Sequence, residues 1–74
     1  MPDKITPRRM TYFVNERDYE EENIRNMIKA TGISYTEIPT SGHLTIFAYY
    51  SDGFCQSCYG PTSIKRYLRG LGDY

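Results

Sequence analysis

The sequence predicts an α+β domain of two layers, with two helices packed on a four-stranded mixed sheet in the order β-α-β-β-β-α. The strongest signal is Asp52-Gly53 between two apolar runs, because Asp-Gly in that setting favours a tight hairpin turn. An amphipathic helix then opens at Gly60-Pro61, since proline suits the first helical position. Before the hairpin, a strand–helix–strand pattern implies two parallel strands joined by a right-handed crossover.

Length and composition limit the possibilities. A chain of 74 residues makes one domain with a small margin of stability. Residues 1–9 are polar with two prolines, so we expect a flexible N-terminal arm and a single domain over residues 10–74. Nine basic and nine acidic residues cancel, which gives no overall field toward nucleic acid or membrane. There is no membrane-spanning apolar run and no apolar segment behind the N-terminus, so we expect a cytoplasmic protein.

The first half of the domain has clear boundaries. Met10–Val14 is rich in β-branched and aromatic residues and predicts the first strand. Asp18 and Glu21 have the spacing of a capping box, which predicts a helix over Tyr19–Thr31. Gly32 should end this helix in the C′ position. The buried stripe of the helix should consist of Ile24, Met27, Ile28 and Thr31.

The remaining strands differ in polarity. Ile33–Ile38 predicts a short strand that Pro39 ends. Leu44–Tyr50 is apolar on both alternating faces, which predicts an interior strand covered on both sides. Phe54–Tyr59 is more polar, so we place it at an edge.

The last two elements fix the packing. A two-residue Asp52-Gly53 turn with both residues at positive φ would pair Tyr50 with Cys55 and Phe47 with Cys58. The final helix should then bury side chains that repeat at i, i+3, i+4 and i+7, namely Ile64, Tyr67, Leu68 and Leu71.

Two segments together resemble a known family. Met10–Ile38 is a strand, a helix that closes on a glycine, and a strand of the form GIxYxEI; Leu44–Leu71 is a hairpin followed by a helix. In this pattern most of the chain resembles a shortened glutaredoxin, the small thioredoxin-fold family. The family places a redox Cys-x-x-Cys where this chain has residues 15–18, Asn-Glu-Arg-Asp, and a cis-proline where it has Gly42-His43. The family's helix between the second and third strands is also missing, so no catalytic residue carries over.

Cys55 and Cys58 form a Cys-x-x-Cys of their own, followed by a helix. A redox pair works at a helix N-terminus, where the dipole lowers the thiol pKa, so a glutaredoxin-like thiol–disulfide oxidoreductase is one alternative function. On a strand, however, these cysteines would face opposite sides and lie roughly 10 Å apart, whereas a disulfide needs Cα atoms within about 7 Å. We therefore expect one cysteine packed inward and one on the other face.

Metal and acid–base sites are not predicted. His43 is the only histidine, and with two cysteines it falls short of the four ligands of a structural zinc site. We expect His43 in a solvated loop, and no metal or cofactor. The carboxylates at positions 20–22 fan out around a helix start, where they suit the positive end of the helix dipole.

A basic face on the last helix raises a second alternative, a small RNA-binding domain. Lys65, Arg66 and Arg69 share that face and could contact phosphates while nearby tyrosines stack on bases. The α-β-β-β-α order from Tyr19 also resembles the double-stranded-RNA-binding domain, although residues 61–63, Pro-Thr-Ser, replace that family's lysine-rich helix start. The simpler interpretation is that these charges form the solvated side of the helix.

Tyrosine is in excess, with eight in the chain. Tyrosine and arginine are enriched at protein–protein hot spots, and an edge strand flanked by them could pair with a partner's strand or with itself across a two-fold axis. We therefore expect a small non-enzymatic protein that binds a protein partner stoichiometrically, as a regulator or inhibitor such as phages and mobile elements encode. The expected partner-binding residues are Tyr49, Tyr50, Tyr59, Lys65, Arg66 and Arg69.

Overall fold

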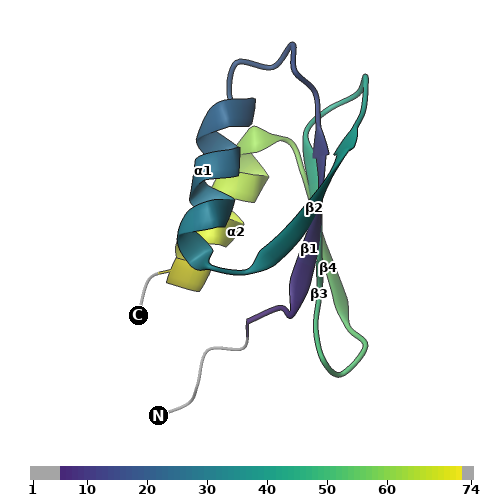
Figure 1. Cartoon of the computed structure of the whole chain (residues 1–74), viewed down its shortest axis with the longest axis vertical. Helices are drawn as coiled ribbons and strands as arrows, with labels where there is room; N and C mark the ends of the chain where they lie inside the picture. Colours follow the sequence, from purple (N-terminus) through teal and green to yellow (C-terminus); the bar gives the residue numbers. More distant parts are fainter. Residues whose placement is uncertain (1–5, 73–74) are drawn as a thin grey trace.

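A computed structural model describes residues 6–72 of the chain. Its elements are β1 (Arg9–Val14), α1 (Glu21–Thr31), β2 (Ser34–Pro39), β3 (Thr45–Tyr49), β4 (Cys55–Tyr59) and α2 (Pro61–Gly72). Both helices lie on one side of a twisted sheet (Figure 1). The predicted two-layer α+β fold and its element order are therefore confirmed.

The sheet has four strands in the order β2-β1-β3-β4. β1 runs parallel to β2 and antiparallel to β3, and β4 runs antiparallel to β3. The prediction that β3 is interior and β4 an edge is confirmed. Residues 1–5 of the predicted arm lie outside the described residues. Arg9 begins β1, and Arg8 is held to the sheet because its N–H donates to the Tyr49 carbonyl at 2.8 Å.

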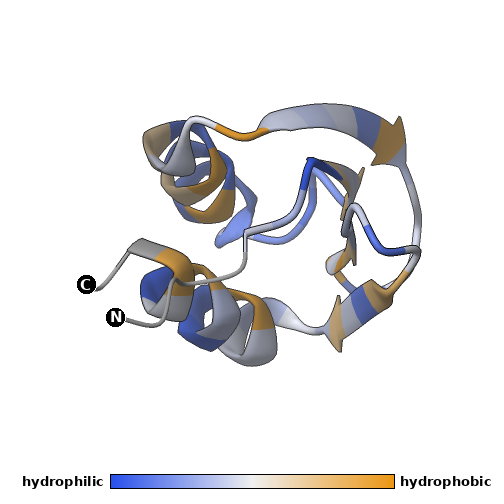
Figure 2. Cartoon of the chain, turned by 90° about the horizontal axis from the view of Figure 1, so that it is seen from below, coloured by the Kyte–Doolittle hydropathy of each residue, from blue (hydrophilic) through white to orange (hydrophobic). Residues whose placement is uncertain are grey.

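The core lies between the helices and one face of the sheet. Alternate residues of β1 and β3 point into it and meet the apolar stripes of both helices. Figure 2 shows hydrophobic bands, in orange, along both helix ribbons. Each fully buried aliphatic side chain contributes roughly 1.5–3 kcal/mol. The buried residues are Met10, Tyr12, Val14, Ile24, Ile28, Leu44, Ile46, Ala48, Cys58, Ile64, Leu68 and Leu71. Met27 and Tyr67 are only partly buried at its margin.

The ends of α1 agree only in part with prediction. Gly32 ends the helix with φ of 77°, and its N–H donates to the Lys29 carbonyl, as expected of a left-handed C′ glycine. The predicted capping box is wrong, because the N-cap residue is Glu20 and no side chain caps it. Asp18 instead accepts the Glu20 N–H at 2.9 Å, which closes an Asx turn and starts the helix two residues later than predicted.

The hairpin between β3 and β4 has a longer loop than predicted. The Tyr50 N–H donates to the Phe54 carbonyl at 2.9 Å, so three residues form the loop. Only Gly53, with φ of 92°, has positive φ there. A three-residue loop of this kind ends on a left-handed glycine and shifts the pairing by one residue. Cys58 therefore lies opposite Ile46 rather than Phe47, which turns its side chain toward the helices.

The prediction that β3 is covered on both sides is wrong for the described residues. The helices cover one side, where Ile46 and Ala48 are completely buried. On the other side Thr45, Phe47 and Tyr49 are half-buried by neighbouring side chains of the sheet. Residues 40–44, which connect β2 to β3, contain no helix that could cover this other side of the sheet. Within the described part of the chain, no helix is long and apolar enough to cross a membrane.

Candidate binding face

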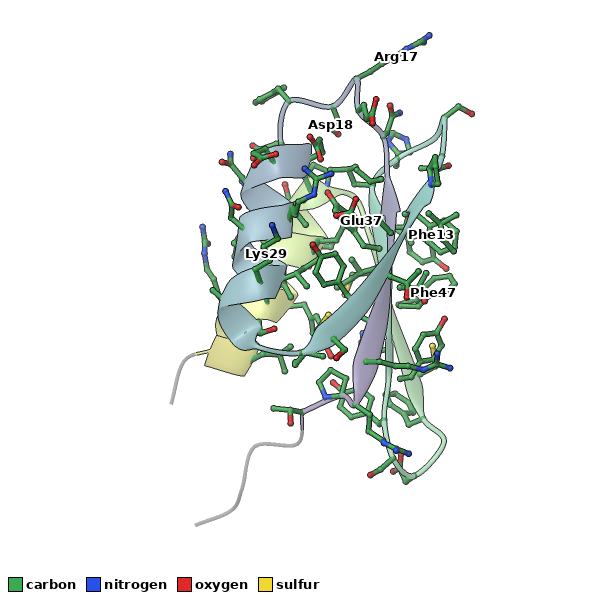
Figure 3. All side chains as sticks on the ribbon, viewed as in Figure 1. Phe13, Arg17, Asp18, Lys29, Glu37 and Phe47 are labelled. Carbon is green, nitrogen blue, oxygen red and sulfur yellow. The ribbon has the colours of Figure 1, made fainter. Side chains whose placement is uncertain are left out.

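One face of the sheet turns away from both helices, and we call it the open face. Strand alternation and the pairing register assign three residues of each strand to it. They are Arg9, Thr11 and Phe13 of β1, Ser34, Thr36 and Ile38 of β2, Thr45, Phe47 and Tyr49 of β3, and Cys55, Ser57 and Tyr59 of β4. Figure 3 shows two of these side chains, Phe13 and Phe47, on the side of the sheet away from α1.

Aromatic side chains form the centre of the open face. The rings of Phe13 and Phe47 meet edge to face, with centroids 5.5 Å apart and planes at 62°. Tyr59 is 65% exposed and Ile38 is 40% exposed on the flanking strands. Between β1 and β4 the surface dips into a shallow groove of about 360 Å³, lined by Phe13, Thr40, Gly42, His43, Thr45, Phe47 and Tyr59. This groove has the size and lining to hold apolar side chains of a ligand.

A cationic end adjoins this aromatic centre. The Arg9 guanidinium lies over the Tyr49 ring, 5.0 Å from its centroid, and the Thr11 hydroxyl donates to the Tyr49 hydroxyl at 3.2 Å. A second hollow of about 450 Å³ is lined by Arg8, Arg9, Ser34, Tyr49 and Tyr50. Neither Arg8 nor Arg9 forms an ion pair with a carboxylate of residues 6–72. Their charges therefore stay open to an anionic group.

Acidic side chains gather on the helix side of the sheet, opposite the open face. None of the twelve strand positions of the open face is Asp or Glu. On the helix side Arg25 of α1 donates to Glu37 of β2 through Nε at 2.6 Å and Nη2 at 3.1 Å. Nη2 also lies 2.9 Å from a carboxylate oxygen of Glu21, and Nη1 lies 2.8 Å from one of Glu22. The Arg25 hydrogen bonds hold the pKa of the Glu37 carboxyl below its ordinary value.

The structure separates the six residues expected to bind a partner. Tyr49 and Tyr59 lie on the open face. Tyr50 is half-buried, with its hydroxyl against that of Tyr67 and its ring 5.8 Å from that of Phe54. Burial and this contact with Tyr50 raise the pKa of Tyr67. The tyrosines of the hairpin thus divide between the open face and the margin of the core.

The three basic residues belong to α2, in the opposite layer. Lys65 pairs with Glu20 of the segment before α1, at 3.2 Å. Arg66 and Arg69 are exposed. Because α2 packs on the helix side of the sheet, the basic face and Tyr59 do not form one surface.

The two cysteines also separate. Cys55 is exposed on the open face, Cys58 is buried among core side chains, and both are free thiols. Burial raises the pKa of the Cys58 thiol, which lowers its reactivity near neutral pH. The expectation of one inward and one outward cysteine is confirmed, and both lie within β4 rather than at the start of α2.

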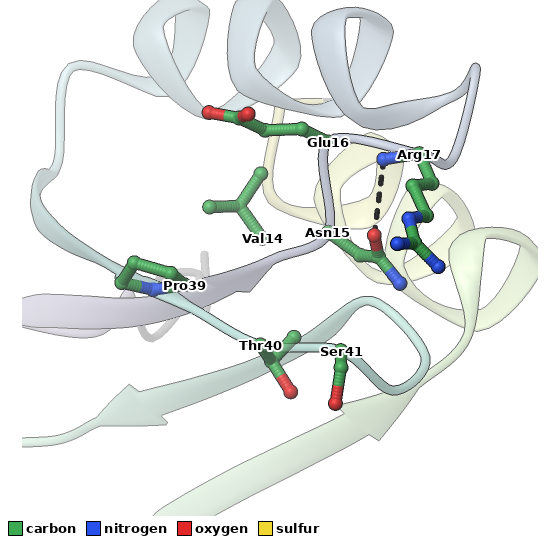
Figure 4. Close-up of a pocket in the computed structure, with 7 residues that line it drawn as sticks. All are labelled: Val14, Asn15, Glu16, Arg17, Pro39, Thr40 and Ser41. Carbon is green, nitrogen blue, oxygen red and sulfur yellow. Dashed lines mark hydrogen bonds between the residues drawn. The ribbon is translucent and has the colours of Figure 1, made fainter.

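A small pocket lies at the carboxyl ends of β1 and β2 (Figure 4), where open α/β sheets commonly bind ligands. It measures about 340 Å³ and is lined by Val14, Asn15, Glu16, Arg17, Pro39, Thr40 and Ser41. Asn15 accepts the Arg17 N–H at 3.0 Å and donates to the Gly42 carbonyl at 2.8 Å. The bond to Gly42 ties this loop to the one before β3, so Asn15 has a structural role. Among residues 6–72, no group of His, Cys, Asp and Glu is arranged to hold a metal ion.

Four residues of the open face that contribute to the candidate site were not among the predicted site residues, namely Arg9, Phe13, Ile38 and Phe47, nor was His43, which lines the groove. The available signal was the apolar character of Leu44–Tyr50 on both of its faces. That pattern predicted that other elements cover both faces of this strand, whereas one of its two faces belongs to an aromatic surface that no helix covers.

The sequence matches no family model and no curated protein. The relationship to glutaredoxins therefore stays a prediction, and we infer function from the surface of the molecule.

Proposed function

We propose that this protein is a non-enzymatic binding protein whose open face holds an apolar segment of a protein partner. In this proposal the groove beside Phe13 and Phe47 receives apolar side chains of the segment. An acidic residue of the segment pairs with Arg8 or Arg9. Such a protein acts stoichiometrically in the cytosol, as a regulator or inhibitor of its partner.

The observation that carries the proposal is the uncovered aromatic centre of the open face. A ligand that covered Tyr59, Ile38 and the two phenylalanines would remove apolar surface from water. Each Å² of buried apolar surface contributes roughly 25 cal/mol of favourable free energy. Aromatic and arginine side chains in one patch have the composition of protein–protein hot spots. Carboxylates are absent from the strand positions of the face, which favours an acidic rather than a basic partner segment.

Three observations favour protein over single-stranded nucleic acid. The edge-to-face geometry of Phe13 and Phe47 makes a ridge and a groove, whereas bases stack on ring faces. The strand positions of the open face hold one guanidinium, that of Arg9, and it already stacks on Tyr49. The formal net charge of the chain is zero, which gives little of the counterion-release energy that drives nucleic-acid binding.

The redox alternative has less support. A thiol–disulfide enzyme needs its two sulfurs within bonding distance, whereas Cys55 and Cys58 lie on opposite faces of one strand. The buried thiol also has a raised pKa, the reverse of an activated cysteine.

Matched tyrosine variants test the proposal. Tyr59→Ser removes an exposed ring from the open face, while Tyr19→Ser removes one that is 87% exposed just before α1. The chain is immobilised, proteins bound from lysate of its native host are identified, and the affinity of each is compared among wild type, Tyr59→Ser and Tyr19→Ser. We expect Tyr59→Ser to lower the affinity for the partner at least tenfold, which is about 1.4 kcal/mol of binding free energy. Tyr19→Ser should leave that affinity unchanged.

The same variants distinguish the alternatives. An equal loss of affinity in both variants, or a loss of affinity only in Tyr19→Ser, would contradict the proposal. Tight, strongly salt-dependent binding of a single-stranded oligonucleotide that Tyr59→Ser abolishes would assign the open face to nucleic acid instead.

A further inference from the structure

The outer edge of β4 carries backbone groups that no strand of residues 6–72 pairs with. The Ser57 carbonyl among them accepts a long bond, 3.4 Å, from the Gln56 side-chain amide, which a pairing strand would replace. Two hydrogen bonds fix the ladder with β3: Tyr50 N–H to Phe54 carbonyl at 2.9 Å, and Gly60 N–H to Leu44 carbonyl at 2.7 Å. In an antiparallel pair, alternate residues direct their N–H and C=O toward the neighbour. Between these two bonds, Gln56 and Cys58 therefore face β3. The N–H and C=O groups of the other three residues of β4 point away from the sheet; those residues are Cys55, Ser57 and Tyr59.

This edge lacks the features that usually block strand pairing. β4 contains no charged residue and no proline, whereas β2 at the opposite edge has Glu37 and ends in Pro39. Edge strands of soluble proteins are normally protected by charges, prolines or bulges. Residues 38–64 carry one charged side chain, Asp52 in the hairpin loop. An unprotected edge in such a neutral hairpin is suited to accept another strand.

The helix above this edge also presents a neutral flank. Lys65 reaches Glu20, so its flank of α2 faces α1. Ser63, Tyr67 and Gly70 repeat at i, i+4 and i+7 on the other flank, toward the β4 edge. Two of these residues are small, and a Cβ at Gly70 would meet no atom within 4 Å. The exposed Arg66 borders this flank, three residues after Ser63 and four before Gly70.

We propose that β4 pairs antiparallel with β4 of a second copy of this chain, across a two-fold axis at Ser57. This register uses all three outward-facing residues, with Ser57 opposite the partner's Ser57 and Cys55 opposite the partner's Tyr59. A shift by two residues in either copy would use fewer of them. The uncharged β4 edge is self-complementary, which favours a second copy over a charged partner strand.

The pairing joins two sheets into one and keeps both open faces on the same side. It therefore doubles the length of the proposed binding face, because the pairing uses the backbone of Cys55, Ser57 and Tyr59 and leaves their side chains on that face. The inference does not depend on what binds the open face, since it rests on the edge of β4.

The molar mass in solution tests the pairing. By light scattering, wild type should have twice the chain mass of 8.6 kDa. Ser57→Pro removes an N–H that points outward, so the bonds to β3 remain. Ser57→Lys places two ammonium groups opposite each other at the axis. Both variants should be monomeric, with a wild-type circular dichroism spectrum. A monomeric wild type, or a folded variant that stays dimeric, would overturn the proposal.

Disulfide cross-linking tests the register. In a Cys55→Ser background, Ser57→Cys places two thiols in a hydrogen-bonded pair with Cα atoms about 5.5 Å apart, within disulfide range. Mild oxidation should link the two copies. In wild type, Cys55 and the partner's Cys55 should be roughly 13 Å apart along the strands and should not link. Efficient linkage through Cys55, with none through the introduced thiols, would overturn the register.

Discussion

The ring of Phe13 meets the ring of Phe47 edge to face, 5.5 Å between centroids, on the side of the sheet that carries no helix. The two residues are diagonal neighbours, because Phe13 lies opposite Thr45 and Phe47 opposite Thr11. Aromatic side chains can span such diagonal positions. The contact keeps both rings partly out of water while leaving the remaining surface for a ligand. The open face is therefore an ordered surface and not an unfilled part of the core.

The two faces of β3 should respond differently to truncation. Ile46→Ala removes a completely buried side chain and should reduce the free energy of unfolding by about 2–5 kcal/mol. Phe47→Ala loses the aromatic contact and part of its burial, and should cost about 1–2 kcal/mol. Urea unfolding measures both. If Phe47→Ala lowered the free energy of unfolding as much as Ile46→Ala or more, the open face would contribute to folding stability as the hydrophobic core does.

The two thiols should differ in reactivity. Cys55 is exposed, whereas Cys58 is 7% exposed and burial raises its pKa. A chromogenic disulfide reagent at neutral pH should label one thiol per native chain, and two in denaturant. Cys55→Ser should abolish the native reaction. Rapid labelling of both thiols, or an intramolecular disulfide by mass spectrometry, would restore the oxidoreductase alternative.

The Arg25–Glu37 pair should give a pH-dependent contribution to stability. Arg25 lowers the pKa of Glu37, so its stabilisation is present above the unfolded-state pKa of about 4.3 and is lost as the pH falls through the folded-state value. Arg25→Ala should reduce the free energy of unfolding at neutral pH by about 1 kcal/mol. The difference from wild type should shrink toward zero in acid. Arg66→Ala, an exposed arginine on α2, serves as the control and should cost little at any pH.

The outcome that would contradict this account is a pH-independent loss in Arg25→Ala. Such a loss would mean that the arginine acts through the packing of its aliphatic stem and not through the ion pair.

Much of the fold follows from the pattern of the sequence. Hydrophobic periodicity located both helices and all four strands, because Ile24, Ile28, Ile64 and Leu68 can be buried only on one side of each helix. Gly32 was assigned correctly, since a left-handed residue at a helix end favours glycine. These features depend on local chemistry, which a single sequence contains.

The errors depend on backbone angles and on tertiary context. Asp52-Gly53 marks a turn but does not specify its length, and one extra loop residue placed Cys58 opposite Ile46 and not opposite Phe47 as predicted. The apolar face of β3 that includes Phe47 indicated burial without saying what covers it. The grouping of Tyr59 with Arg66 failed because the side of the sheet on which α2 packs is decided by the whole chain.

The most direct test of the proposed binding face uses a fluorescent reporter. The chain contains no tryptophan, so Tyr59→Trp and Tyr19→Trp each introduce a single one, on the open face and near the start of α1. Emission spectra are recorded as the partner, freed of its own tryptophan by substitution, is added. We predict a blue shift for Tyr59→Trp and an unchanged spectrum for Tyr19→Trp. A shift in Tyr19→Trp with none in Tyr59→Trp would contradict the assignment of binding to the open face.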